Sequence, residues 1–248
     1  MIEWRDEGVL LTVRRHGESA AIIDAFTPNH GRHAGLVRGG TSRKMAPILQ
    51  PGAHLSLEWR ARLDEHLGAY KVDPIRSRAG VLLGDGDALA AMSAVAALLT
   101  AYLAEREVRS NLYAATVALL DILGVDDEWP KAYVAWEMAL LSDLGYPLDL
   151  SACAATGASD DLIWVSPRTG RAVSRSAGAP YADRLLPLPA FLTGAPSNSD
   201  GVADGLRMTG HFLKNWVAPA FGGHSPPQAR ERLEARIRKR NDLAPSPL

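Results

Sequence analysis

Five short segments with the character of β-strands follow one another in the first 73 residues, and this succession restricts the fold more than any other feature of the chain. The fourth is the clearest, because Leu55, Leu57 and Trp59 alternate with polar residues, as expected for a strand with one buried face. The five segments cover residues 8–16, 19–27, 32–38, 53–62 and 67–73. Such a series predicts a small barrel such as the OB-fold.

The sequence changes from strand-like to helix-like after Pro74. Residues 86–104, 111–123 and 130–144 have apolar residues at helical spacing, and Pro130 suits the first turn of the third helix. Further helices are expected at about 200–217 and 227–240. The predicted fold class is therefore α+β. A five-stranded OB-fold domain would cover residues 1–78, and a mainly helical domain would cover residues 79–248, with an irregular insertion at about 146–190.

Composition excludes several classes of protein. Cys153 is the one cysteine of the chain, so no intramolecular disulfide can form, and a reducing compartment is expected. The first residues are charged and lack the apolar core of a signal peptide. The most apolar stretch, residues 88–104, is interrupted by Ser93 and Thr100 and predicts a buried helix instead of a membrane span. We therefore expect a cytoplasmic protein.

The formal net charge of −1 conceals an uneven distribution. Residues 1–78 carry 12 Lys or Arg and 9 Asp or Glu, a net charge of +3. Residues 79–227 carry 9 and 16, a net charge of −7, and residues 228–248 carry 6 and 3, again +3. A polyanionic partner is therefore compatible with the near-neutral total, because both ends of the chain are basic.

The segment 38–52 is glycine-rich and cationic. Gly39 and Gly40 open it, Pro51 and Gly52 close it, and no acidic residue occurs until Glu58. We interpret it as a flexible loop that hangs from the barrel and grips phosphate. The loop belongs to a longer cationic stretch, residues 32–62, which we call the barrel arm. The nucleic-acid-binding residues predicted on the barrel arm are Arg32, Arg38, Arg43, Lys44, Arg60 and Arg62.

Two alternatives accompany this interpretation. The cations could simply form a solvated surface. The aromatic residues Trp4, Phe26, Trp59 and Tyr70 could stack on bases, although Trp59 alternates with Leu55 and Leu57 and is therefore expected in the core.

The last helix predicted, residues 228–240, carries six basic and two acidic residues. Leu233 and Ile237 lie four residues apart and could anchor one face. We expect accessory nucleic-acid contacts from its basic end, but a cationic end would also suit the C-terminal dipole of a helix. The residues concerned are Arg236, Arg238, Lys239 and Arg240.

No catalytic motif is present, and we predict that the chain is not an enzyme. Its acidic cluster, residues 126–128, lies where acids favour the start of a helix. His30 and His33 flank a turn and have no third ligand nearby, so turn polarity is expected from them instead of metal binding. The segment around Asp85 resembles part of a calcium loop but lacks its spaced carboxylates, and we interpret it as a turn and N-cap. We predict neither cofactor nor metal.

The order of several short motifs resembles that of the RecO family of bacterial recombination mediators. Each motif alone is weak, but together they span nearly the whole chain in the family's order. The motifs are residues 24–27 followed by Gly31, the basic loop ending in Leu49-Gln50-Pro51, residues 144–150 followed by Cys153 and Thr156-Gly157, and residues 165–170.

The resemblance implies an N-terminal OB-fold and a C-terminal helical domain with a zinc-ribbon-like insertion. It also implies binding of single- and double-stranded DNA, annealing of complementary strands, and help in loading a recombinase onto DNA coated by single-strand-binding protein. The implied partners are DNA, the RecR protein and the acidic C-terminal tail of the single-strand-binding protein. A cytoplasmic, nucleoid-associated location would follow.

This chain departs from the zinc-bearing members of that family. Those carry two Cys-x-x-Cys pairs, whereas here the first reads Cys153 to Thr156 and the second would fall near Ser174 and Ala177. Structural zinc needs four sulfur or imidazole ligands. We therefore expect a degenerate insertion without metal, held by the packing of Leu162, Trp164, Val165 and Val173.

For the acidic tail, a pocket rimmed by cations is needed. We predict Arg106, Arg109 and Lys131 as the partner-binding residues, with Arg106 and Arg109 together at the end of one helix. An ion pair of Arg106 with Glu105 or Glu107 on a solvated turn is the alternative. A second function also stays open: a protein-interaction scaffold of a repair complex, with only incidental DNA contact.

Overall fold

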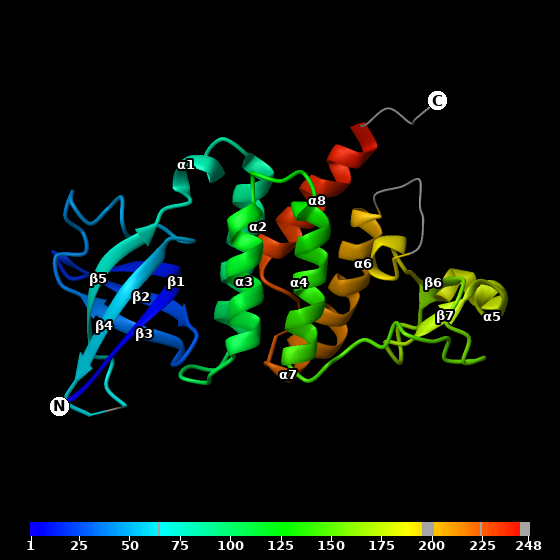
Figure 1. The fold of residues 1–248 in the computed structure, drawn as a ribbon, viewed down its shortest axis with the longest axis horizontal. Helices are drawn as coiled ribbons and strands as arrows, with labels where there is room; N and C mark the ends of the chain where they lie inside the picture. Colours follow the sequence, from blue (N-terminus) through cyan, green and yellow to red (C-terminus); the bar gives the residue numbers. More distant parts are fainter. Residues whose placement is uncertain (64, 195–200, 224, 244–248) are drawn as a thin grey trace. The chain divides into compact units, whose positions relative to one another are not determined.

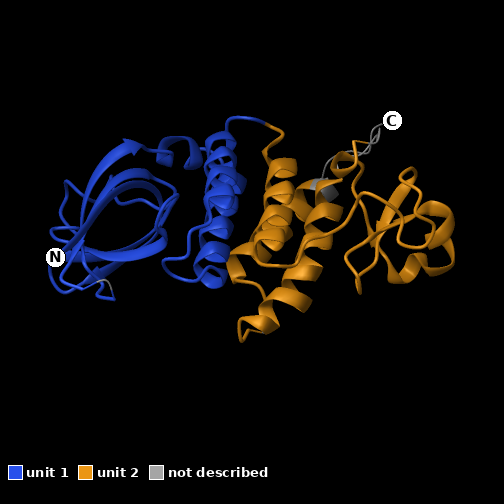
Figure 2. Ribbon diagram, turned by 60° about the horizontal axis from the view of Figure 1, so that its bottom comes forward, with its two compact units in different colours: residues 1–126 blue, residues 127–248 orange. Residues whose placement is uncertain are grey.

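The structure is a computed structural model that describes residues 1–63, 65–194, 201–223 and 225–243 (Figure 1). Its internal contacts divide the chain into two compact units, Met1–Asp126 and Asp127–Leu248 (Figure 2). The first unit therefore contains helices as well as the strands. The change from strands to helices near residue 78 lies inside it. Within the described residues, no helix is both long and apolar enough to span a membrane.

The first unit begins with a closed five-stranded barrel, which confirms the predicted OB-fold. The strands are β1 (Ile2–His16), β2 (Ala20–Thr27), β3 (Gly31–Val37), β4 (His54–Ala61) and β5 (Ala69–Arg76). Their order around the barrel is β1-β2-β3-β5-β4, and β1 closes it by pairing with β4. β1 starts six residues before the predicted strand, because its charged first half pairs with β4 from Ile2↔Ala61 to Val9↔His54.

The barrel interior is filled by alternating residues of all five strands. Trp59 is fully buried there, as predicted, and its Nε1–H donates to the carbonyl of Leu67 at 3.1 Å. Gly68 has a φ of +66°, and a Cβ at this position would lie 2.4 Å from the Trp59 ring. The turn between β4 and β5 therefore requires glycine, since any side chain would push the central tryptophan out of place.

Three helices complete the first unit: α1 (Ala79–Leu82), α2 (Gly86–Tyr102) and α3 (Ser110–Ile122). Asp85 is the N-cap of α2 and accepts hydrogen bonds from the backbone N–H groups of Asp87 and Ala88, which confirms the predicted cap. Arg78, buried at the end of the barrel, donates to the carboxylate of Asp121 and, at 2.8 Å, to the carbonyl of Gly52. These bonds join the strands to α3.

The second unit is mainly helical, as predicted. It contains α4 (Trp129–Asp143), α6 (Val202–Phe212), the π-helical turn η3 (Leu213–Val217), α7 (Ala218–Ala220) and α8 (Gln228–Leu243). Pro130 lies in the first turn of α4. Leu233 and Ile237 are both buried and anchor α8, which confirms that prediction.

The insertion between α4 and α6 contains a small sheet of order β7-β6-β8. Leu162, Val165 and Val173 are buried in it and Trp164 is partly buried, in agreement with the predicted packing. The likeness to a zinc ribbon stays a prediction. The elements are β6 (Leu162–Val165), β7 (Ala172–Ser174), α5 (Arg175–Gly178), η1 (Ala179–Arg184), β8 (Leu186–Pro187) and η2 (Ala190–Leu192).

Candidate nucleic-acid interface

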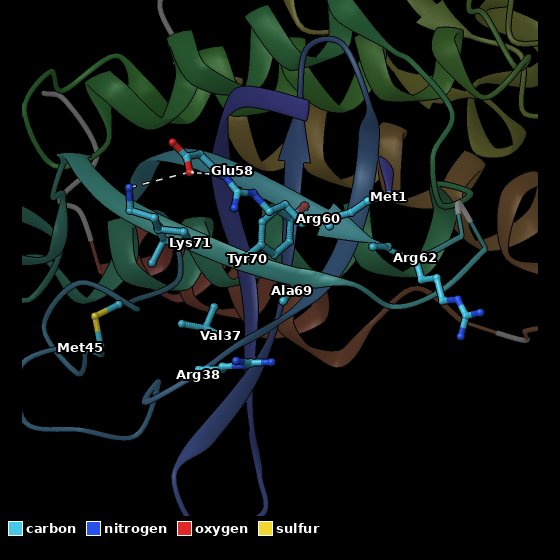
Figure 3. Close-up of a pocket in the computed structure, with 12 residues that line it drawn as sticks. Met1, Val37, Arg38, Met45, Glu58, Arg60, Arg62, Ala69, Tyr70 and Lys71 are labelled. Carbon is cyan, nitrogen blue, oxygen red and sulfur yellow. Dashed lines mark ion pairs between the residues drawn. The ribbon is translucent and has the colours of Figure 1, made fainter. Parts of the chain in front are cut away.

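A groove with a volume of about 940 Å³ lies on the barrel (Figure 3). β5 pairs with β3 only through Ala69 and Tyr70, and the groove lies where the two strands part. Side chains from β3, β4 and β5, from the loop after β3, from the residue directly after β4 and from the N-terminus contribute to its lining. They are Met1, Val37, Arg38, Met45, Glu58, Arg60, Ala61, Arg62, Ala69, Tyr70, Lys71 and Val72.

The groove has an apolar floor because core side chains reach its surface. Val37, Tyr70 and Val72 belong to the buried core of the barrel and also line the groove. Met45, partly buried, packs against the same core from the loop that follows β3. A ligand in the groove would therefore meet apolar atoms at the bottom and charged groups at the sides.

The charged groups of the groove are mostly cationic. Among the described residues that line it, Glu58 is the one acidic residue, and it is shared by Arg5 at 3.0 Å, Lys71 at 3.8 Å and Arg60 at 3.9 Å. Arg60 also pairs with Glu3 at 2.9 Å. Among the described residues, Arg38 and Arg62 form no ion pair. Positive charge therefore exceeds negative charge here, which favours an anionic ligand.

The predicted flexible loop is wrong in one respect, because it is folded and packed on the barrel. Met45, Ile48 and Leu49 follow a helical spacing, and all three pack against the barrel core. Within this turn the N–H of Leu49 donates to the carbonyl of Met45 at 2.9 Å. Arg43 and Lys44 are exposed on the outside of the turn. An ordered loop can present these cations with less loss of conformational entropy on binding.

Three further cations lie on this surface and were missed in the sequence. Lys71 stands between the buried Tyr70 and Val72, so strand alternation alone would have placed it outward. Arg14 and Arg15 are exposed in the β1–β2 hairpin. The tip of that hairpin contacts the basic loop, because the N–H of Thr41 donates to the carbonyl of Ser19 at 3.2 Å.

Arg32 lies in a different environment from the other predicted residues of the arm. Its side chain is only 14% exposed, and it pairs with Asp24 at 2.6 Å. Its Nε–H donates to the carbonyl of Leu103 at 3.1 Å, in the connection between α2 and α3. Burial raises the pKa of Asp24 to about 6, although the charge of Arg32 opposes this rise. We assign Arg32 a structural part, outside the groove.

The candidate stacking residues are covered by other side chains. Phe26 and Trp59 are fully buried. The Tyr70 hydroxyl donates to the carbonyl of His33 at 3.3 Å, and burial raises the pKa of Tyr70. Trp4 stacks against His30 at 4.0 Å and against Trp59 at 5.7 Å. Base stacking on Phe26, Trp59 or Trp4 would therefore require side chains to move, and Tyr70 reaches the groove with only 5% of its surface exposed.

The two histidines of the turn after β2 have structural partners. His30 pairs with the Asp6 carboxylate at 2.9 Å, and His33 is buried beside the carbonyl of Ala34. No group of three or more potential metal ligands occurs among the described residues.

The zinc positions of the insertion do not fit a metal ion. Cys153 is buried, and its Sγ accepts a hydrogen bond from the N–H of Ser174 at 3.2 Å. Hydrogen bonds from Ser174 and Thr156 lower the pKa of the Cys153 thiol to about 6. A serine, a threonine and an alanine stand where the other three thiolates would be needed.

The predicted cations of α8 are exposed on the second unit. Arg238 pairs with Glu234 at 2.9 Å, one turn away. Arg236, Lys239 and Arg240 are exposed, and Arg236 and Arg240 also interact with other groups. Arg230, which the sequence did not single out, is instead buried and binds both carboxylate oxygens of Glu137, at 3.0 and 3.1 Å.

The predicted partner-binding residues lie in two different units. Arg106 and Arg109 belong to the segment between α2 and α3, so their placement at a helix end was wrong: α2 ends at Tyr102. Arg106 has a φ of +65° and donates to the carbonyl of His66 at 3.0 Å, and Arg109 pairs with Glu107 at 2.7 Å. Lys131, in the second unit, pairs with Glu128 at 2.6 Å.

Comparisons with known proteins match both parts of the chain. Residues 1–78 match the family model described as "Recombination protein O N terminal", and residues 83–222 match "Recombination protein O C terminal". The chain is also similar to curated proteins named "DNA repair protein RecO". The relative from Dinoroseobacter shibae is 57% identical over 233 residues, which cover 94% of this chain and 97% of the relative.

Two further relatives agree. That from Ruegeria sp. is 57% identical over 240 residues, 96% of this chain and all of the relative, and that from Jannaschia sp. is 52% identical over 232 residues, 94% and 95% of the two chains. With an OB-fold barrel, a helical unit and near full-length identity of this level, the chain belongs to the RecO family of DNA repair proteins.

Proposed function

We propose that this chain is a DNA-binding recombination mediator without a catalytic centre. It would anneal complementary strands and help load a recombinase onto single-stranded DNA coated by single-strand-binding protein. Its partners would be single- and double-stranded DNA, the RecR protein and the C-terminal tail of the single-strand-binding protein. A nucleoid-associated location would follow from DNA binding.

The main support is the cationic groove of the barrel. Arg38, Arg60, Arg62 and Lys71 line it above an apolar floor, with Glu58 as the single acid among the described lining residues. Grooves of OB-folds that combine such cations with apolar surface suit the phosphates and bases of a nucleic acid strand. Arg43 and Lys44 extend this surface along the folded loop.

The proposal is tested by DNA binding as a function of salt. A variant with Arg38→Ala, Arg43→Ala and Lys44→Ala should bind more weakly to all sequences. It should also flatten the slope of log affinity against log salt by about 2–3, because each lost phosphate contact removes roughly 0.7–0.9 from the slope. Fluorescence anisotropy with a labelled oligonucleotide measures both quantities.

A matched control has the same change in net charge. Arg168→Ala, Arg175→Ala and Arg184→Ala remove three exposed arginines of the insertion, which belongs to the second unit. This control should keep the slope of the unaltered protein. Strand annealing and recombinase loading on coated DNA should fall in the loop variant and not in the control. Equal slopes in the two variants would contradict phosphate binding by the loop and favour the scaffold function.

A further inference from the structure

Apolar side chains emerge from the barrel at one point of its rim. The inner face of β4 passes through the buried Leu57, Trp59 and Ala61, and Leu63, which is 47% exposed, stands in the bend two residues after the strand ends. Ile2, the first residue of β1, pairs with Ala61 and is 40% exposed, and Met1 before it is 94% exposed. We call Met1, Ile2 and Leu63 the apolar rim.

The apolar rim is continuous with the cationic groove. Met1 and Ala61 line the groove, and so does Arg62, which stands between Ala61 and Leu63 in the sequence. Figure 3 shows Met1 and Arg62 on one side of the groove and Met45 on the other. A strand that follows the cations of the groove would therefore reach the apolar rim at that end.

The chemistry of this arrangement fits one kind of ligand. Single exposed apolar residues are common on proteins, but Met1, Ile2 and Leu63 all stand within two residues of the Ile2–Ala61 pair beside the cationic groove, and water solvates such a surface poorly. An unpaired nucleic acid strand has phosphates that match the cations and base faces that match the apolar atoms. A duplex keeps its base faces stacked inside and offers them only at its ends.

We infer that the apolar rim, which borders the cationic groove at Met1 and Ala61, contacts unstacked bases of a single strand whose phosphates lie in that groove. This inference rests on the proposed DNA-binding function and adds to it a surface that selects unpaired strands. The cations hold the backbone of either kind of DNA, while the rim gains contacts only when base faces are open.

The test compares two labelled oligomers of equal length and charge, one of deoxythymidine and one fully abasic. The unaltered protein should bind the thymidine oligomer roughly tenfold more tightly, because the abasic oligomer offers the rim no base faces. The variant Ile2→Ser/Leu63→Ser should lose most of this preference. Its slope of log affinity against log salt should not change, because no phosphate contact is removed.

The control replaces two exposed apolar residues of the same unit, Val81→Ser and Leu83→Ser, which do not line the groove. It should keep the preference for bases. Both variants should unfold at the same temperature as the unaltered protein, since the replaced side chains are exposed.

Several results would overturn the inference. If the rim variant kept the full preference for thymidine, the rim would not contact bases and would serve another ligand, such as a protein. A variant that weakens both oligomers equally would show a contact with the backbone. If the unaltered protein bound both oligomers equally but with a steep salt dependence, the inference would fail while the proposed function stood. If the unaltered protein bound neither oligomer, both the inference and the proposed function would be contradicted.

Discussion

The barrel arm and helix α8 look alike as sequences, since each is a run of arginines and lysines with few acids, yet they differ as structures. Around the groove, Glu58 is the one acid among several cations, and Arg38 and Arg62 form no ion pair among the described residues. On α8, Glu234 pairs with both Arg230 and Arg238. The positive charge that a surface offers a ligand therefore depends on the acids that the fold brings to it.

Each region also contains one arginine whose side chain is largely buried. Arg32 pairs with Asp24 in the barrel, and Arg230 pairs with Glu137 in the helical unit. The carboxylates of the two pairs differ in how many of their hydrogen bonds are formed. Glu137 also accepts hydrogen bonds from Thr209 and, at 3.0 Å, from Tyr133. Asp24 keeps one buried oxygen, Oδ1, without a hydrogen-bond partner in the part of the chain that the structure describes.

The largest effect is expected at the well-satisfied pair. Arg230→Ala would leave the Glu137 carboxylate buried without its counterion, which typically costs about 3–5 kcal/mol. Urea denaturation should show this loss in the free energy of unfolding. Arg238→Ala, on the exposed side of α8, serves as the control and should cost less than about 1 kcal/mol. Similar losses of unfolding free energy in the two variants would contradict the difference between buried and surface cations of this helix.

The poorly satisfied pair should make stability depend on pH. The pKa of Asp24 is about 6 when folded, against 3.8 for an ordinary carboxyl, so the folded protein binds this proton more tightly than the unfolded chain. The contribution of Asp24 to stability is therefore greatest below pH 3.8 and is lost as the pH rises through 6. At about 1.4 kcal/mol per pKa unit, the difference of 2.2 amounts to about 3 kcal/mol at most.

Asp24→Asn should remove this dependence. The free energies of unfolding of the variant and the unaltered protein, measured in urea between pH 4 and pH 7.5, should diverge in favour of the variant as the pH rises. Other titrating groups cancel in the difference. The ion pair with Arg32 is already included in the pKa of Asp24, so the difference between the two curves reports the net effect of burial and pairing. Parallel curves would contradict a raised pKa at Asp24.

A smaller effect is expected from the exposed end of α8. Replacing Arg236, Arg238, Lys239 and Arg240 by alanine removes four cations, one more than the variant of the barrel loop. We nevertheless expect the salt slope of DNA binding to flatten by less than one, because neighbouring acids on the helix already compensate part of this charge. A decrease larger than that of the loop variant would reverse the ranking of the two regions.

No effect is expected from removal of metal. Untagged protein should contain far less than one zinc per chain, and a chelator should leave the thermal midpoint unchanged, because no folding energy is linked to metal binding. Elemental analysis and thermal unfolding measure the two quantities. Stoichiometric zinc that stabilises the fold would require ligands other than Cys153.

The sequence predicted those parts of the molecule whose information is local. The five strands and the anchors Leu233 and Ile237 follow from periods of two and of three to four residues. The first half of β1 was missed because Glu3, Arg5 and Asp6 hide its alternation. The loop after β3 was expected to be flexible because its glycines and cations obscured the helical spacing of Met45, Ile48 and Leu49.

Two arginines whose environment the sequence did not indicate have partners far away in the chain. Arg230 is buried by Glu137, 93 residues earlier, and Arg32 is held by the carbonyl of Leu103, 71 residues later. No local pattern indicates which cation of a run will find such a partner. Lys71 is the opposite case, since the alternation of β5 would have sufficed to place it on the outer face, although its pairing with Glu58 follows from the register of β4 with β5.

The bonds that join the barrel to α2 and α3 also set an order of events during synthesis. Gly31 lies against the backbone of Glu107, where even a Cβ would come within 2.1 Å of the carbonyl oxygen, and Arg78 is bound by Asp121, 43 residues downstream. A ribosome adds roughly 5–20 residues per second. After β5 has been synthesised, several seconds therefore pass before Asp121, the partner of Arg78, is added to the chain.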